Sequence, residues 1–121
     1  PSALNPTIPC AFICECILHA NNGRDIGEDS KAGLLTLANL LGFANSKVLY
    51  VGLIGCAYLG VMTLALFKAR IAVFLVLLSL PAAIDCIGHF SRDKNLIADL
   101  PKRTAKLHMI FGTCLTLGVL A

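Results

Sequence analysis

The sequence predicts an all-α fold in which several transmembrane helices pack as a bundle. Hydrophobic residues make up 57% of the 121 positions and charged residues only 14%, whereas ordinary soluble domains are about 25% charged. The mean hydropathy is +0.80. Segment 48–67 carries no charge and segment 71–90 a single acid, and each can supply the roughly 20 helical residues that a bilayer core requires. An integral membrane protein is therefore expected, with the lipid bilayer as a partner and no nucleic-acid partner.

Two shorter apolar segments, 6–20 and 107–121, complete a plan of four spans. Helices are expected because lipid offers no partners for backbone hydrogen bonds, and four segments of this length are too few for a closed barrel. Pro81 is expected to kink the third span or to lie where neighbouring groups compensate. The chain starts without methionine and ends inside an apolar run, so we interpret it as a fragment. No segment has the order of a cleaved signal peptide.

Two long polar connections and one short one link these spans. Eight of the ten basic residues lie in the long connections, and only Lys68 and Arg70 lie in the short one. The positive-inside rule therefore places both long connections on the cytoplasmic side.

The long connections contain helix signals of their own. In the first, segment 34–41 is apolar and predicts a short helix, with Gly42 as its C-terminal stop and Ser46 as the cap of the next span. In the second, Pro101 is well placed to begin the last helix.

Six cysteines fall within apolar runs, and their spacing predicts neither disulfides nor zinc. No second Cys or His pair follows the first group at a suitable distance. Buried structural thiols are expected at Cys10, Cys14, Cys16, Cys56, Cys86 and Cys114.

The most informative polar segment follows the first span and reads NNGRDIGED over residues 21–29. On a helix, Asp25 and Asp29 are close neighbours, and their like charges repel unless a cation lies nearby. Magnesium is the natural candidate because it takes one or two carboxylates and completes its shell with water and substrate phosphates. Alternatively, both aspartates are solvated loop residues that pair with Arg24 or Lys31. The residues alone leave these two interpretations about equally open.

A continuous helix would extend this polar patch back into the first span. One stripe would then contain Glu15, His19, Asn22, Asp25 and Asp29. Such a stripe must face protein or a water-filled cavity. Equally, Glu15 and His19 could form a satisfied pair inside the bundle, and Asn21 and Asn22 could be turn residues.

Residues 15–38, ECILHANNGRDIGEDSKAGLLTLA, resemble the second aspartate-rich motif of UbiA-type intramembrane prenyltransferases. The resemblance is strongest to the menaquinone-forming branch, whose pattern reads N-N-x-R-D-x-x-x-D followed by A-G and T-L-A. Residues 100–107, LPKRTAKL, with Phe111 and Gly112, are similar to the start of the family's last span. Leu34 and Leu35 stand where bacterial members usually carry a basic residue, which favours the animal-like form.

The resemblance covers nearly the whole chain, so residues 1–121 are interpreted as a partial UbiA prenyltransferase domain. It implies about the last four helices of a nine-helix fold, without the first aspartate-rich motif. It further implies a magnesium-dependent enzyme of menaquinone biosynthesis, which moves a polyprenyl group from an isoprenyl diphosphate to an aromatic, naphthoquinone-type acceptor. A eukaryotic endomembrane, either endoplasmic reticulum or Golgi, is the implied location. The fragment alone is expected to be inactive.

The site that the resemblance implies combines catalytic, magnesium-binding aspartates with diphosphate-binding residues. The aspartates are Asp25 and Asp29, and the diphosphate-binding residues are Arg24, Asn22, Asn21 and Lys31. Arg24 suits a phosphate because its planar guanidinium donates parallel hydrogen bonds. The family often has arginine where Ser30 stands here, and Lys31 is expected to substitute for it.

Two other classes of function fit the same residues. One is a non-catalytic membrane scaffold or regulatory protein that binds a lipid or a partner. The other is a cation-conducting or transport subunit, which a stripe of carboxylates alone would permit.

The remaining charged residues are assigned structural roles. Lys102, Arg103 and Lys106 are expected to satisfy the positive-inside bias rather than to attract substrate. Asp85 could face a cavity, reach the interface or pair with His89 one turn later, and no catalytic role is assigned to it.

Overall fold

The structure is a computed structural model that describes residues 5–68 and 71–121. The described residues form helices and no strand: α1 (Thr7–Arg24), α2 (Ile26–Lys31), α3 (Leu37–Lys68), the 3₁₀-helix η1 (Ile71–Ser79), α4 (Leu80–His89), α5 (Lys94–Ala98) and α6 (Leu100–Leu120). The predicted all-α class is therefore confirmed. Arg70 of the predicted short connection, like Ala69, lies outside the described residues, as does the side chain of Lys68.

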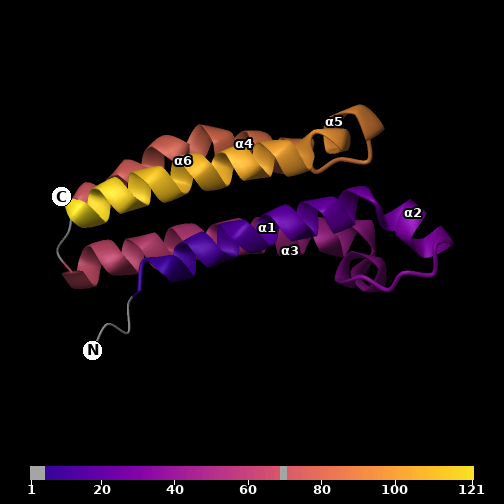
Figure 1. Cartoon of the computed structure of the whole chain (residues 1–121), viewed down its shortest axis with the longest axis horizontal. Helices are drawn as coiled ribbons and strands as arrows, with labels where there is room; N and C mark the ends of the chain where they lie inside the picture. The colour runs from indigo at the N-terminus through magenta and orange to yellow at the C-terminus, as the bar shows by residue number, and fades with distance from the viewer. Residues whose placement is uncertain (1–4, 69–70) are drawn as a thin grey trace.

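The long helices pack side by side in two layers (Figure 1). Helix α1 packs against α3 in one layer, while α6 packs against η1 and α4 in the other; α1 also contacts α6 across the layers. The short helices α2 and α5 lie at the same end of the bundle, and the C-terminus lies at the other (Figure 1). Both long polar connections therefore share one end, which is the arrangement expected from the distribution of basic residues.

Helix α3 contains a segment long and apolar enough to cross a membrane. Leu37–Phe67 has 31 residues and a mean hydropathy of 2.0, and Val73–His89 is a shorter apolar helix. Of the four predicted spans, the second alone meets this criterion of length and composition within the described ranges. The multi-pass topology stays a prediction.

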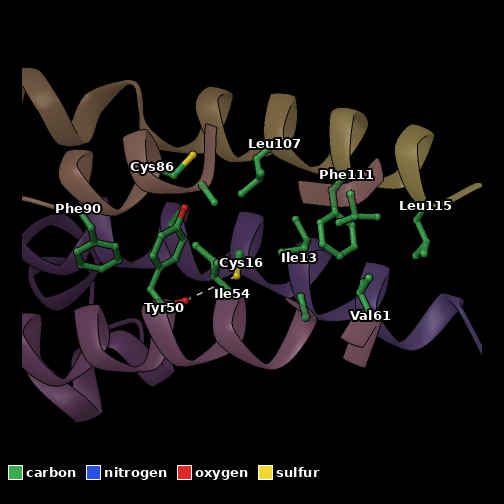
Figure 2. Packing of buried hydrophobic residues seen from close by; sticks show 14 of the residues in the cluster. Ile13, Cys16, Tyr50, Ile54, Val61, Cys86, Phe90, Leu107, Phe111 and Leu115 are labelled. Atoms are coloured by element: carbon green, nitrogen blue, oxygen red, sulfur yellow. Dashed lines mark hydrogen bonds between the residues drawn. The ribbon is translucent and has the colours of Figure 1, made fainter. Parts of the chain in front are cut away.

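The core lies between the layers and receives side chains from each long helix. Figure 2 shows side chains from α1, α3 and α6, together with Cys86 of α4 and Phe90 just after it, converging there. Tyr50, Phe90 and Phe111 are its largest fully buried side chains. The Tyr50 hydroxyl lies 2.7 Å from the Thr104 hydroxyl oxygen, which in turn donates to the Leu100 carbonyl at 2.8 Å. This polar chain joins α3 to the start of α6, and such bonds matter because hydrophobic driving force between helices is lost in lipid.

Gly42 ends the short helix at the start of α3, as the sequence predicts. Its φ of 75° lies in the left-handed region, and the path is non-helical there, a conformation that glycine adopts without steric cost. The predicted capping role of Ser46 is wrong, because helix resumes directly after Gly42 and so includes Ser46. Its buried hydroxyl instead donates to the Ala38 carbonyl at 3.3 Å, across the kink.

The predicted third span is helical from residue 71 to 89, but it consists of two helix types. Pro81 lies in the first turn of α4, where a missing backbone N–H costs nothing. The proline is thus accommodated at a boundary between helices. Pro101 likewise lies in the first turn of α6, which confirms the predicted helix start.

All six cysteines are free thiols, which agrees with the expected absence of disulfides. Cys16 and Cys86 are buried in the core, as predicted. Cys14 and Cys56 are exposed on the outside of the bundle, so the expectation of burial within this chain is wrong for these two. Both lie on helix faces that no other described helix covers.

Candidate functional site

The polar motif, residues 21–29, covers the last turn of α1 and most of α2. Asp25 is the residue between the two helices, with φ −99° and ψ 11°. The Asp25 N–H donates to the Asn21 carbonyl at 3.1 Å, and the Asp29 N–H donates to the Asp25 carbonyl at 2.8 Å. The helical path therefore continues through a bend, and Asp25 and Asp29 stay one turn apart, as the sequence predicts.

The end of α1 is fixed by close packing between Gly23 and Phe90. A Cβ atom on Gly23 would lie only 2.6 Å from Cζ of Phe90. Phe90 is fully buried, and its ring centroid lies 5.3 Å from that of Phe43 and 5.1 Å from that of Tyr50. Because the ring is held from several sides, only glycine fits at position 23, directly before Arg24.

Helix α2 is tied to the start of α3 by Asn39. The Asn39 side-chain amide donates to the Ile26 carbonyl at 2.9 Å and to the Ser30 hydroxyl at 2.7 Å. The Thr36 hydroxyl accepts from the Asn39 backbone N–H at 3.2 Å, which caps the helix, and also bonds the Asn39 side-chain oxygen. These contacts give Thr36 of the T-L-A pattern a structural role.

Arg24 and Asp25 form a two-bonded ion pair. The Arg24 Nε donates to one carboxylate oxygen of Asp25 at 2.6 Å, and Nη2 donates to the other at 2.7 Å. The hydrogen bond from Arg24 holds the pKa of Asp25 below its ordinary value, and the same bond raises the pKa of Arg24. Asp25 is therefore an ionised carboxylate at neutral pH, with both oxygens already accepting hydrogen bonds.

A polar pocket of about 550 Å³ opens beside this ion pair. The α1–α2 region and α5 line it with Arg24, Asp25, Gly27, Glu28, Lys31, Lys94, Ile97 and Ala98. Three of the six predicted site residues thus come together here, namely Arg24, Asp25 and Lys31. Glu28 and Lys94 were not predicted. Glu28 stands within the acidic run, which was a usable signal, whereas Lys94 is distant in sequence and only its charge could have pointed to it.

The other predicted residues lie near the pocket without lining it. Asn21 donates its side-chain amide to the Ile17 carbonyl at 3.2 Å, within its own helix. Asn22 and Asp29 are half-buried. The assignments of Asn21, Asn22 and Asp29 to substrate or metal stay predictions.

The predicted polar stripe on α1 does not form one surface. His19 is buried, and its Nε2 lies 2.9 Å from the Ser46 carbonyl oxygen. Glu15 is exposed. Because His19 packs against α3, it is a core residue that bonds a neighbouring helix, and the alternative of a buried Glu15–His19 pair is also wrong.

The oxygen donors of the pocket suit a hard cation that brings most of its own ligands. Across residues 5–68 and 71–121, no cluster of three or more His, Cys, Asp or Glu side chains forms a complete metal site. Asp25 and Glu28 offer carboxylates at the pocket wall. This set fits magnesium, which takes one or two carboxylates and obtains its other ligands from water and phosphates. Coordination by Asp25 would require Arg24 to move off the carboxylate.

A second charged cluster joins α4 to α6. The Arg103 Nη1 donates to the Asp85 carboxylate at 2.7 Å. His89 Nδ1 donates to the Asp85 backbone carbonyl at 2.8 Å and lies 3.5 Å from the other carboxylate oxygen. Asp85 therefore pairs with His89, as one of its alternatives foresaw, and also with Arg103. Arg103 bridges two helices. Lys102 and Lys106, at the same end of α6, are exposed.

No protein-family model matches the chain. Curated relatives do match it, and they carry the name UbiA prenyltransferase domain-containing protein 1. The protein from Dictyostelium discoideum is 38% identical over 114 residues, covering 94% of this chain and 34% of its own length. The chicken (Gallus gallus) protein is 39% identical over 119 residues, covering 98% and 35%, and the human (Homo sapiens) protein is 37% identical over 113 residues, covering 93% and 32%.

The chain therefore spans about a third of the length of the curated relatives it matches, in their C-terminal part. The similarity runs through nearly all of the chain, including the acidic motif and the start of α6. The resemblance that these segments indicate is confirmed, because relatives 37–39% identical over about 94% of this chain are named UbiA prenyltransferase domain-containing protein 1.

Proposed function

We propose that the protein carrying this chain is a membrane prenyltransferase that moves a polyprenyl group from its diphosphate to an aromatic, naphthoquinone-type acceptor in menaquinone biosynthesis. The observation that carries the proposal is the pocket in which Arg24, Asp25 and Lys31 meet, at one end of a bundle with a candidate membrane helix. The relatives are named as prenyltransferase domain-containing proteins, which supports this class of reaction. We place the pocket on the cytoplasmic face of a eukaryotic endomembrane.

Prenyl transfer requires the site to stabilise the diphosphate as it leaves. Its negative charge grows as the bond to the prenyl carbon breaks, so preorganised cations lower the barrier. Arg24 offers a planar, two-bonded grip on phosphate oxygens, and Lys31 adds a mobile point charge. A magnesium ion, when bound, would supply further charge neutralisation on the leaving group.

The proposed reaction requires Arg24 and Asp25 to give up their ion pair and bind new partners. Both Asp25 oxygens accept hydrogen bonds from Arg24 in this structure. For Asp25 to hold a cation and Arg24 to hold a diphosphate, this pair must open. Each residue then gains a partner of opposite charge, so the cost of breaking the first contact is offset.

Replacing the two aspartates in the complete protein tests the proposal. Asp25→Asn and Asp29→Asn are each expected to lower the rate of prenyl transfer at least about a hundredfold, the scale found when one electrostatic stabiliser is lost. The measurement is transfer of labelled prenyl diphosphate in isolated membranes. Removal of divalent cations with a chelator should abolish transfer, and added magnesium should restore it.

Asp99→Asn is the matched control, because it makes the same chemical change at the same end of the bundle without touching this pocket. Its rate should stay near wild type. Near-wild-type transfer by both Asp25→Asn and Asp29→Asn would refute the metal assignment. Partner or lipid binding that survives both substitutions, without any transfer by the wild-type protein, would favour the scaffold alternative.

A further inference from the structure

We infer that Lys94, carried by α5, is a third cationic ligand of the diphosphate, so that the second long connection forms one wall of the site. This inference rests on the proposed function and deepens it. Lys94 lines the same pocket as Arg24 and Lys31, although it lies 70 and 63 residues after them in the sequence. The acidic motif alone would not identify it.

Helix α5 is anchored firmly enough to keep Lys94 at the pocket. The Asp93 carboxylate caps the helix by accepting the Asn95 N–H at 2.8 Å. Ile97 is only 6% exposed, and Leu100, the first residue of α6, is fully buried. In Figure 1, α5 lies at the same end of the bundle as α2. The backbone of α5 is thus fixed by one cap and two apolar anchors, while the Lys94 side chain is free to adapt.

Charge balance in the pocket favours an anion, because basic side chains outnumber carboxylates in its lining. Its lining contains three basic side chains, Arg24, Lys31 and Lys94, and two carboxylates, Asp25 and Glu28. The shortest contact pairs Arg24 with Asp25. In the described part of the chain, no carboxylate lies within salt-bridge distance of Lys94. Lys94 therefore does not give up an ionic partner when it binds a phosphate.

The ammonium group of Lys94 is well suited to bind a diphosphate. A lysine ammonium is a compact charge with three donors on a flexible stem, so it reaches phosphate oxygens without demanding one geometry. Arg24 and Lys31 approach from the α1–α2 side, and Lys94 approaches from α5. A diphosphate between them would be held by residues of three helices, α1, α2 and α5.

The test measures binding of inorganic pyrophosphate, with magnesium, to the purified complete protein by titration calorimetry. Lys94→Gln is expected to weaken binding about tenfold, the size of one charge-assisted hydrogen bond. Lys94→Arg should stay within about threefold of wild type. In membranes, Lys94→Gln should raise KM for the prenyl diphosphate by a similar factor while kcat changes less, because a ground-state contact is lost.

Lys102→Gln is the control, because it removes an exposed lysine at the same end of the bundle that lines a separate pocket. It should leave pyrophosphate binding unchanged. Unchanged binding by Lys94→Gln, or an equal loss with Lys102→Gln, overturns the inference and leaves the proposed function intact. A wild-type protein that neither binds pyrophosphate nor transfers prenyl groups overturns both.

Discussion

Individual side chains at the end of α1 explain why the acidic motif contains glycine. Gly23 is buried against the ring of Phe90, and that ring also contacts His19, Phe43 and Tyr50. The contact orients the last turn of α1 and therefore the residue that follows it, Arg24. A packing requirement thus stands directly beside a charged residue of the proposed site.

Gly23→Ala is expected to destabilise the bundle, because a Cβ atom 2.6 Å from Phe90 Cζ forces the ring or the helix to move. Overpacking of this kind costs about 1–3 kcal/mol. The midpoint of thermal unfolding in detergent measures it. Gly88→Ala is the control, since nothing lies within 4 Å of a Cβ atom there, and its midpoint should not fall.

A double substitution identifies the cause. Gly23→Ala combined with Phe90→Leu should lose less stability than the two single changes together, because the smaller side chain frees space for the new methyl group. Simple additivity of the two losses would show that Gly23 is needed for another reason.

The protonation of Asp25 bears on how the pocket works. Arg24 lowers the pKa of this carboxyl, so their interaction stabilises the fold above the unfolded pKa of aspartate and is lost as pH falls through the lower, folded pKa. Both side chains are about one-third exposed, so solvent weakens this contribution. Near neutral pH, protons therefore do not compete with a metal cation for the Asp25 carboxylate, whereas Arg24 does.

The short helix α2 depends on a neighbouring element for its position. Its six residues are too few for a stable isolated helix, and none of them is buried. Asn39 of α3 supplies the tether through its bonds to Ile26 and Ser30. The placement of Glu28 and Lys31 at the pocket thus depends on a residue outside the acidic motif.

Asn39→Ala is expected to loosen α2 while leaving the bundle folded. Loss of these hydrogen bonds, at about 1 kcal/mol or more in total, should increase amide hydrogen exchange in residues 26–31 about fivefold to tenfold. Mass spectrometry of exchanged peptides measures this. Asn45→Ala is the control, because among the described residues the Asn45 side chain bonds the Leu41 carbonyl of its own helix and no other group. Equal protection of α2 in both variants would show that other contacts hold it.

Elements marked by local chemistry were predictable from the sequence, and those set by tertiary packing were not. Gly42 and Pro101 signal helix ends through their own backbone preferences, and both predictions are confirmed. Ser46 carries an ordinary capping signal, yet the helix begins before it. In the candidate site, Arg24, Asp25 and Lys31 share one short segment and could be grouped in advance. Lys94 reaches the same pocket only because the fold brings α5 to the same end of the bundle as α2 (Figure 1).

The outer surface of the whole bundle is unusually apolar for a protein in water. Leu59, Leu66 and Phe67 of α3 are 67%, 74% and 77% exposed, and Leu120 of α6 is 78% exposed. Large contiguous apolar surface on a monomer marks contact with lipid or with other protein. Both are consistent with a chain that matches about a third of its relatives' length.

The length of α3 sets how the bundle would sit in a bilayer. The 31 residues of Leu37–Phe67 extend to roughly 46 Å at about 1.5 Å per residue, which exceeds a hydrocarbon core of about 30 Å. We predict that the excess lies at the kinked start around Gly42, next to α2. The pocket would then lie outside the hydrocarbon region, where charged side chains are tolerated.

Limited proteolysis of sealed vesicles tests this placement. The first connection offers trypsin Arg24 and Lys31, and the second offers Arg92 and Lys94, all at one end of the bundle. Trypsin on the cytoplasmic face should therefore release peptides from both connections, and trypsin on the opposite face should release neither. Mass spectrometry identifies the cut sites, and detergent-opened vesicles show that the sites are cleavable. Cleavage of one connection from each face would mean that α2 and α5 lie on opposite sides of the membrane. No single pocket could then join Arg24 to Lys94.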